Sequence, residues 1–395
     1  MSVDRWLLPE GVDELLPPDA ARLETLRRRV LDLHASWGYE LVIPPFIEYL
    51  ESLLVGTGSD LDLKTFKLTD QLTGRLMGVR ADMTPQLARI DARSRRDDAC
   101  RRLCYLGTVL HALPDGFTRT RSPVQLGAEL YGHAGFESDC EILSLMLETI
   151  AIAGVEDVHV DLGHVGIFRA LARQANMGSD EESNLHDALQ RKARAEIDAH
   201  LESAAAPGHL SRMIAALADL NGDVSTLADA RGVLADGCEE VTEAIDRLAR
   251  IASVIATRYP RTPVHVDLAE LRGYRYHTGV VFAALVPGHG QEIARGGRYD
   301  AIGSAFGRPR PATGFSTDVK SLLALSGEAR IAAEAETILA PWSAAPELTA
   351  RVDALRAAGK RVVYELPGER RPVADGVVRA LRERDGEWQV VDLDE

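Results

Sequence analysis

Residues 122–131 read SPVQLGAELY, an apolar stretch in which Gln125 and Glu129 fall on one face of a predicted strand. A second apolar stretch, 103–110 (LCYLGTVL), precedes it across a loop that contains Pro114, Asp115 and Gly116. The two stretches predict a pair of strands. A polar group buried without a partner costs about 1–3 kcal/mol, so Gln125 and Glu129 are expected to meet each other or a ligand.

The segments before this strand pair predict one helix and further strands. Residues 21–37 carry Leu23, Leu26, Val30, Leu33 and Trp37 at spacings of three and four, which is typical of an amphipathic helix. Residues 39–43 (YELVI) predict a strand that ends at two prolines. Residues 65–70 and 76–80 flank Gly74 and predict a hairpin.

The segments after the strand pair alternate between strand and helix character. Strands are predicted at 158–162, 264–268, 279–285 and 312–315, and the Ala/Leu-rich stretch 167–259 predicts helices. Within that stretch a strict spacing of four predicts one buried helical stripe, formed by Leu185, Leu189, Ala193, Ile197 and Leu201. The fold predicted for residues 1–325 is an α+β core with a mixed sheet, interrupted by a helical insertion at 167–260.

The last segment, 331–395, predicts a small separate α/β domain. Its pattern indicates, in order, a strand at 337–340, a helix at 347–357, a strand at 361–366, a helix at 373–384 and a strand at 388–393.

Composition excludes several classes of protein. The 395 residues are 46% hydrophobic, and no apolar run approaches the roughly 18 residues that span a bilayer. The first ten residues are charged and lack a signal-peptide core, so a cytoplasmic location and no membrane contact are expected. A formal net charge of −15 disfavours tRNA as a partner. The four cysteines form no CxxC pair, so neither a metal site nor a cofactor is predicted.

Four segments place polar side chains inside apolar surroundings: RADMTP (80–85), QLGAE (125–129), LRGYRYHTG (271–279) and ARGGRYD (294–300). Together they supply what an amino-acid ligand needs. Asp82, Thr84 and Gln125 could accept from its ammonium group, Arg272 could hold its carboxylate, and Glu129 could accept the N–H of a polar side chain. Each of these residues also has a purely structural interpretation. Asp82 or Glu129 alone could form an ordinary ion pair, and Arg298 alone could form a salt bridge. Gly296–Gly297 could form a tight turn.

These motifs resemble histidyl-tRNA synthetase, a class II aminoacyl-tRNA synthetase, over residues 8–325. Residues 38–45 resemble the first class II motif, which forms a homodimer interface, and 105–132 resemble the second. The resemblance implies that Asp82, Thr84 and Gln125 hold the ammonium group of histidine, that Glu129 reads the imidazole beside Tyr276 and His277, and that Arg272 faces the carboxylate. His277 stands where a tyrosine is usual. Residues 167–259 stand where the family carries its insertion domain.

The resemblance fails where class II enzymes hold ATP. His111 stands in place of the second-motif arginine, and Ser321 in place of the third-motif arginine. Losing one preorganised electrostatic contact costs about 3–4 kcal/mol of transition-state stabilisation, so losing both predicts a chain without catalytic residues. The synthetase's anticodon-binding domain is also longer than 331–395.

A synthetase-like chain of this kind resembles the family of ATP phosphoribosyltransferase regulatory subunits. That resemblance implies a non-catalytic role in the first step of histidine biosynthesis, feedback regulation by L-histidine, and a hetero-octamer with a short-form catalytic subunit. The alternatives are a histidyl-tRNA synthetase or a related paralogue that activates an amino acid. Histidine-dependent ATP–pyrophosphate exchange would separate them from the regulatory subunit.

Overall fold

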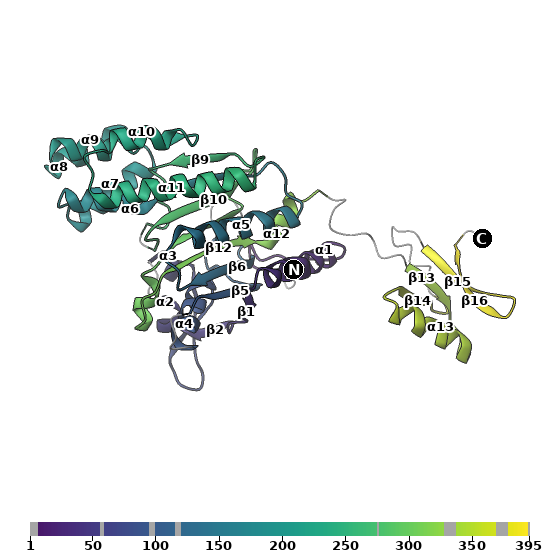
Figure 1. The fold of residues 1–395 in the computed structure, drawn as a ribbon. Coiled ribbons are helices and arrows are strands. Elements are labelled where there is room, and N and C mark those ends of the chain that lie inside the picture. The colour runs from purple at the N-terminus through teal and green to yellow at the C-terminus, as the bar shows by residue number, and fades with distance from the viewer. Residues whose placement is uncertain are drawn as a thin grey trace. The chain divides into compact units, whose positions relative to one another are not determined.

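The computed structural model describes residues 7–55, 59–94, 99–114, 120–274, 276–327, 337–368 and 378–393. Contacts divide the chain into two compact units, residues 1–327 and 328–395 (Figure 1). Of the residues named above, Asp115, Gly116 and Arg275 lie outside the described part, as does 373–377 of the helix expected at 373–384.

A nine-stranded mixed sheet, counted over the described residues, forms the centre of the first unit. Its order is β1 (Glu40–Leu41), β5 (Arg101–Thr108), β6 (Val124–Tyr131), β12 (Ala312–Asp318), β11 (Ala294–Arg298), β10 (Val280–Leu285), β7 (His159–His164), β9 (Val264–Asp267) and β8 (Asn221–Gly222). Neighbours pair antiparallel except β1 with β5 and β7 with β9. This sheet, flanked by helices, confirms the fold class, and β5 and β6 confirm the predicted strand pair. β1 is shorter than the strand expected at 39–43.

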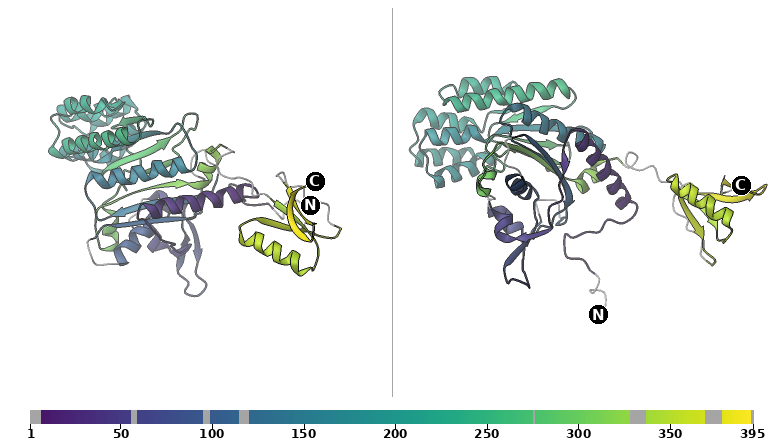
Figure 2. Two further views of the ribbon diagram at one scale, coloured as in Figure 1. Left: turned by 45° about the vertical axis from the view of Figure 1, so that its right-hand side comes forward. Right: turned by 60° about the horizontal axis from the view of Figure 1, so that its bottom comes forward.

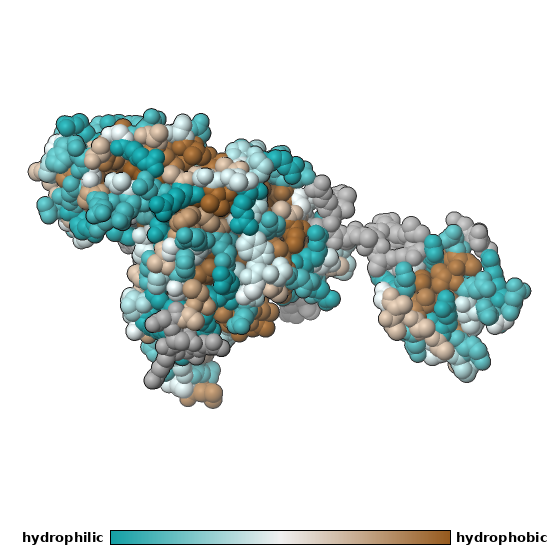
Figure 3. Space-filling view, in the orientation of Figure 1, coloured by the Kyte–Doolittle hydropathy of each residue, from teal (hydrophilic) through white to brown (hydrophobic). Residues whose placement is uncertain are grey.

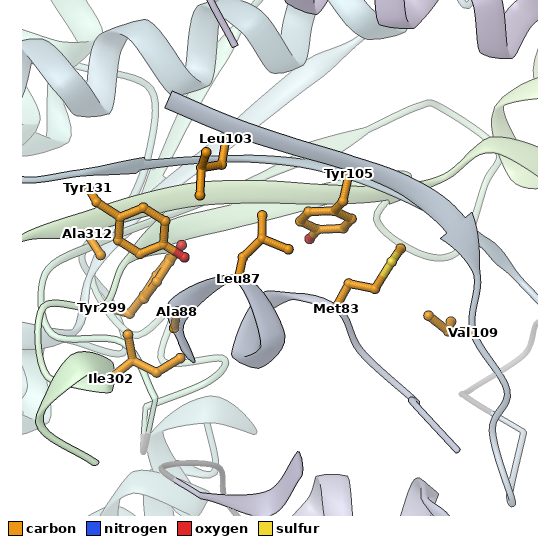
Figure 4. Packing of buried hydrophobic residues seen from close by; sticks show 10 residues of the cluster. All are labelled: Met83, Leu87, Ala88, Leu103, Tyr105, Val109, Tyr131, Tyr299, Ile302 and Ala312. Carbon is orange, nitrogen blue, oxygen red and sulfur yellow. The ribbon is translucent and has the colours of Figure 1, made fainter. Parts of the chain in front are cut away.

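Helices cover both faces of the sheet (Figure 2). On one face α5 (Phe136–Ile152) packs on β6, β10, β11 and β12, and α1 (Asp19–Ser36) packs on α5 and α12 (Val319–Leu325). α4 (Thr84–Ser94) packs on β6 and on η2 (Ile302–Phe306). Figure 4 shows a buried cluster between α4 and the sheet, which contains Leu87, Tyr105 and Tyr299. Apolar burial of this kind is the main stabilising term in folding.

A small three-stranded sheet lies just before α4 in the chain. β4 (Leu76–Val79) pairs antiparallel with both β2 (Ile47–Tyr49) and β3 (Phe66–Thr69), which confirms the predicted hairpin. Gly74 in its turn has φ of +72°, a conformation that favours glycine. The short helices α2 (Leu50–Leu54) and α3 (Ser59–Lys64) lie between β2 and β3 in the chain.

The insertion is helical, but its buried stripe does not belong to one helix. α7 (Ser179–Gln190) ends before Ala193 and α8 (Arg194–Ser203) begins after it, with Lys192 at φ of +50° between them. Leu185, Leu189, Ile197 and Leu201 are all buried, because two antiparallel helices share one apolar contact. The remaining helices are α6 (Val165–Gln174), α9 (Gly208–Ala216), α10 (Thr226–Val233) and α11 (Glu239–Arg258).

Over its described residues, the second unit is a four-stranded sheet with one helix, α13 (Pro346–Ala357). Its strand order is β14 (Arg361–Glu365), β13 (Thr337–Pro341), β15 (Val378–Arg384) and β16 (Glu387–Asp392). The helix predicted at 373–384 is wrong from residue 378 onward, because β15 and β16 form a hairpin over Asp385 and Gly386. Asp-Gly is a strong signal for such a two-residue turn.

Hydrophobic surface shows as separate patches on both units in the face drawn in Figure 3. No helix among the described residues is long and apolar enough to cross a membrane.

Candidate functional site

Asp82, Thr84 and Gln125 form one hydrogen-bonded group at the start of α4. Asp82 Oδ1 accepts from the Thr84 backbone N–H at 2.9 Å and from Gln125 Nε2 at 2.8 Å. Gln125 Oε1 in turn accepts from the Met83 backbone N–H at 2.9 Å. The contacts hold three acceptor groups in fixed positions, from the loop before α4, the first residue of α4 and β6, as a bound ammonium group requires.

Glu129 on β6 is 1% exposed and lies among tyrosine hydroxyls. Tyr105 Oη donates to its Oε1 at 3.3 Å, and Tyr299 Oη donates to its Oε2. Burial raises the pKa of Glu129 to about 8, although the hydrogen bond from Tyr299 opposes the shift; the charge of Asp82 raises the pKa further. A further donor placed against this carboxyl group would favour its ionised form and lower the pKa again.

A glycine opposite Glu129 makes room for its carboxyl group. Gly314 on β12 is the register partner of Glu129, and a Cβ there would overlap Glu129 Oε2. Gly127 plays the same part for Tyr105, whose hydroxyl would collide with a Cβ at that position. Both residues must be glycine for the polar groups to approach the sheet this closely.

Tyr276 and His277 form one wall beside Glu129. The ring of Tyr276 stacks on that of Tyr299, with centroids 4.9 Å apart and planes 29° apart. Tyr276 Oη and His277 Nδ1 are buried and have no hydrogen-bond partner among the described residues. Burial lowers the pKa of His277 to about 4, so its ring is neutral near pH 7. These two atoms are suited to a polar ligand, because a buried polar atom without a partner is costly.

Arg272 is held by carboxylates at the outer side of the same wall. Its Nη1 lies 2.6 Å from Glu292 Oε2, and its Nη2 lies 2.6 Å from Glu270 Oε2. The bond to Glu270 raises the pKa of Arg272, and the charge of Glu292 adds to the shift. A ligand carboxylate would therefore share this guanidinium with two protein carboxylates.

One cavity of about 1010 Å³ unites most of the predicted site. Six of the seven predicted residues line it: Asp82, Thr84, Glu129, Arg272, Tyr276 and His277. Gln125 instead lines a neighbouring cavity of about 240 Å³, although its side chain reaches Asp82. Helix α7 of the insertion lines the outer part of the large cavity with Glu182, His186 and Asp187, among other residues.

Sequence reasoning missed several residues of this site. Tyr299 belongs to the ARGGRYD segment, so its place in that motif was an available signal. Glu270 and Glu292, which hold Arg272, and the α7 residues carry no such signal, because folding alone brings them to the cavity. Gly296 and Gly297 form no tight turn, since they pair within β11 with Phe282 and Val281 of β10. Arg298 forms a buried ion pair with Asp139, which is the salt bridge expected from its purely structural interpretation.

His111 and Ser321, which stand where the resemblance implies the two ATP-binding arginines, both line the smaller cavity. His111 Nε2 lies 3.0 Å from the Ala81 carbonyl, and Ser321 Oγ donates to Asp318 at 2.8 Å. Arg295, for which no role was predicted from the sequence, also lines this cavity. Its guanidinium lies 3.3 Å from Glu292 Oε1. Among the described residues no group of three or more His, Cys, Asp or Glu side chains could hold a metal ion.

Comparison with known proteins places these features in one family. A family model for histidyl-tRNA synthetase matches residues 11–322, and one for the C-terminal domain of ATP phosphoribosyltransferase subunit HisZ matches residues 335–391. The chain is 59% identical over 384 residues to the ATP phosphoribosyltransferase regulatory subunit of Alkalilimnicola ehrlichii, covering 97% of this chain and 96% of that protein. The chain belongs to the family of ATP phosphoribosyltransferase regulatory subunits. It is thus a non-catalytic subunit that acts in histidine biosynthesis, as the resemblance implied.

A second relative and two solved structures are also similar to this chain. The regulatory subunit of Thioalkalivibrio sulfidiphilus is 58% identical over 392 residues, or 99% of both chains. The Bacillus halodurans structure described as an ATP phosphoribosyltransferase regulatory subunit/histidyl-tRNA synthetase has a TM-score of 0.81 at 27% identity, covering 94% of this chain and 95% of that one. The HisG:HisZ complex of Thermotoga maritima has a TM-score of 0.58 at 17% identity, covering 75% of this chain and 97% of that one, and shows the shared fold.

Proposed function

We propose that the large cavity binds free L-histidine and that the subunit reports this ligand to its catalytic partner. Asp82, Thr84 and Gln125 accept from the ammonium group, and Arg272 faces the carboxylate. Glu129 accepts the imidazole N–H, with Tyr276 and His277 against the ring. The observation that carries the proposal is the buried carboxyl group of Glu129, which lies beside two polar atoms without partners on a cavity wall.

The partner in this proposal is a short-form ATP phosphoribosyltransferase catalytic subunit, in a cytoplasmic hetero-octamer. The Thermotoga maritima neighbour is a complex of HisG and HisZ, which supports such an assembly. Histidine would inhibit only through its different affinity for two states of the complex, a coupling of about 1–3 kcal/mol. A net charge of −15 supports the proposal that tRNA is not a partner.

We also propose that two copies pair through the first-motif segment. Leu41 and Ile43 within this segment, and Phe46 and Ile47 directly after it, expose between 41% and 81% of their surface. Four exposed apolar side chains within seven residues are typical of a surface that is covered in an assembly.

A reconstituted complex tests the histidine proposal. The purified chain is mixed with a short-form catalytic subunit, and phosphoribosyl transfer is measured against L-histidine concentration. We expect inhibition with the wild-type chain and at least a tenfold higher half-inhibitory concentration with Glu129→Gln. The exposed Glu243→Gln on α11 is the matched control and should behave as wild type. Transfer that histidine does not inhibit, or histidine-dependent ATP–pyrophosphate exchange by the chain alone, would contradict the proposal.

A further inference from the structure

One loop connects the cavity to the helical insertion. This loop, described over residues 271–274 and 276–277, supplies Arg272, Tyr276 and His277 to the cavity wall. Its backbone turns tightly on itself, since the Tyr276 and His277 N–H groups both donate to the Gly273 carbonyl, at 2.7 and 2.8 Å. These bonds tie Tyr276 and His277 to Gly273, the residue that directly follows Arg272.

Arg169 on α6 contacts this loop at two backbone carbonyls and one ring. Its Nη2 donates to the Tyr274 carbonyl at 2.7 Å and to the His277 carbonyl at 3.2 Å. Its guanidinium also lies 4.6 Å from the centre of the Tyr274 ring, within the range of a cation–π contact. Arg169 does not line the cavity. Its polar contacts are thus directed to the loop.

Helix α7 holds the same loop at a second place. The Tyr274 hydroxyl donates to Glu182, and its ring lies 4.9 Å from that of His186. His186 Nε2 lies 3.2 Å from the Leu271 carbonyl. Glu182 and His186 also line the outer cavity, so α7 contacts both the loop and the space that a ligand would enter.

We infer that Arg169 is a positioning residue for histidine binding, which fixes the 271–277 loop through two backbone carbonyls and so makes the insertion part of the binding site. The inference rests on the proposed histidine site. Nη2 of Arg169 can serve both carbonyls because it carries two hydrogens. Without it the loop loses the group that fixes both its middle and its end. The ligand contacts of Arg272, Tyr276 and His277 then weaken together, although Arg169 touches no ligand.

Titration of L-histidine into purified variants tests the inference. We expect Arg169→Ala to raise the Kd at least tenfold, and Arg169→Lys, which keeps one donor group, to raise it less. Arg173→Ala is the matched control, because Arg173 lies one turn away on α6 in an exposed pair with Glu240. It should bind as wild type does. Wild-type affinity in Arg169→Ala would overturn the inference. If the wild-type chain itself does not bind, the proposed function fails instead.

Double variants distinguish positioning from a general loss of structure. If Arg169 acts through the loop, combining Arg169→Ala with Arg272→Gln should raise the Kd by less than the product of the two single effects. Combining it with Asp82→Asn, on a different element, should give the product. The product in both pairs would show that Arg169 does not act through the loop. If Arg169→Ala does not fold, Arg169→Lys replaces it in both cycles, with the same expected pattern.

Discussion

The hydroxyl of Tyr299 donates a hydrogen bond to the carboxyl group of Glu129, although 170 positions separate the two residues. Glu129 lies on β6, and Tyr299 directly follows β11, with β12 between the two strands. The bond joins two of the four polar segments of the sequence at the bottom of the cavity. It also fixes the orientation of the carboxyl group, which a neutral Tyr299 stabilises without adding charge.

Replacing Glu129 by Gln should change how stability depends on pH. In the folded chain the pKa of Glu129 is raised from an ordinary 4.5 to about 8 by burial. The folded chain therefore binds this proton more tightly than the unfolded chain does. The resulting contribution to the free energy of unfolding is fully present below pH 4.5 and is lost as the pH rises to about 8. Relative to wild type, the Tm of Glu129→Gln should rise as the pH increases from about 5 to about 8.

Differential scanning calorimetry across that range checks this expectation. Glu243→Gln, an exposed substitution of the same kind, should keep a constant Tm offset from wild type. A constant offset for Glu129→Gln as well would show that the buried carboxyl group is ionised throughout the range.

Replacing Arg298 by Met should strongly destabilise the first unit. Arg298 and Asp139 are 4% and 1% exposed at their side chains, and Arg298 Nη2 lies 2.8 Å from Asp139 Oδ1. Removing one partner of a buried pair costs up to about 3–5 kcal/mol when the other charge is left unpaired. Asp139 keeps Arg247 at 3.0 Å, so the loss should fall toward the lower end of that range. Denaturant unfolding should show that loss. Arg191→Ala, in an exposed pair with Glu196, should cost much less stability. Equal losses in the two variants would contradict this account.

Replacing Ile43 by Asp should break the proposed homodimer. Ile43 is 81% exposed in the single chain, so the substitution should leave the fold intact while placing a charge in the paired surface. Light scattering coupled to gel filtration should then give half the wild-type mass. Val233→Asp, on the insertion surface, is the control and should keep the wild-type mass. An unchanged mass for Ile43→Asp would exclude this segment as the interface.

The sequence predicted most of the first unit because its signals are local. Alternation of Gln125 and Glu129 along an apolar strand, and the hairpin around Gly74, depend on near neighbours. The helix expected at 373–384 failed because Val378 and Ala380 pair with a strand near residue 338, a contact that no local pattern shows. Helix propensity is overridden in such cases by tertiary pairing.

In the candidate site too, residues in local motifs were predicted and residues placed by long-range contacts were not. Asp82, Thr84 and Glu129 stand in motifs, and the structure brings them to one cavity. Arg169, Glu270 and Glu292 belong to none of the four motifs. Arg169 donates to the Tyr274 carbonyl, and the two glutamates form ion pairs with Arg272. Residues of this kind become visible only when the chain has folded.

Calorimetric titration of L-histidine into the purified chain tests the central claim most directly. We predict one binding site per chain, with a Kd raised about 10–100-fold in Glu129→Gln, the loss expected for a hydrogen bond to a charged group worth about 1.5–3 kcal/mol. Asp82→Asn should also weaken binding. Absence of measurable binding by the wild-type chain, or equal affinity in wild type and both variants, would contradict the assignment of this cavity to histidine.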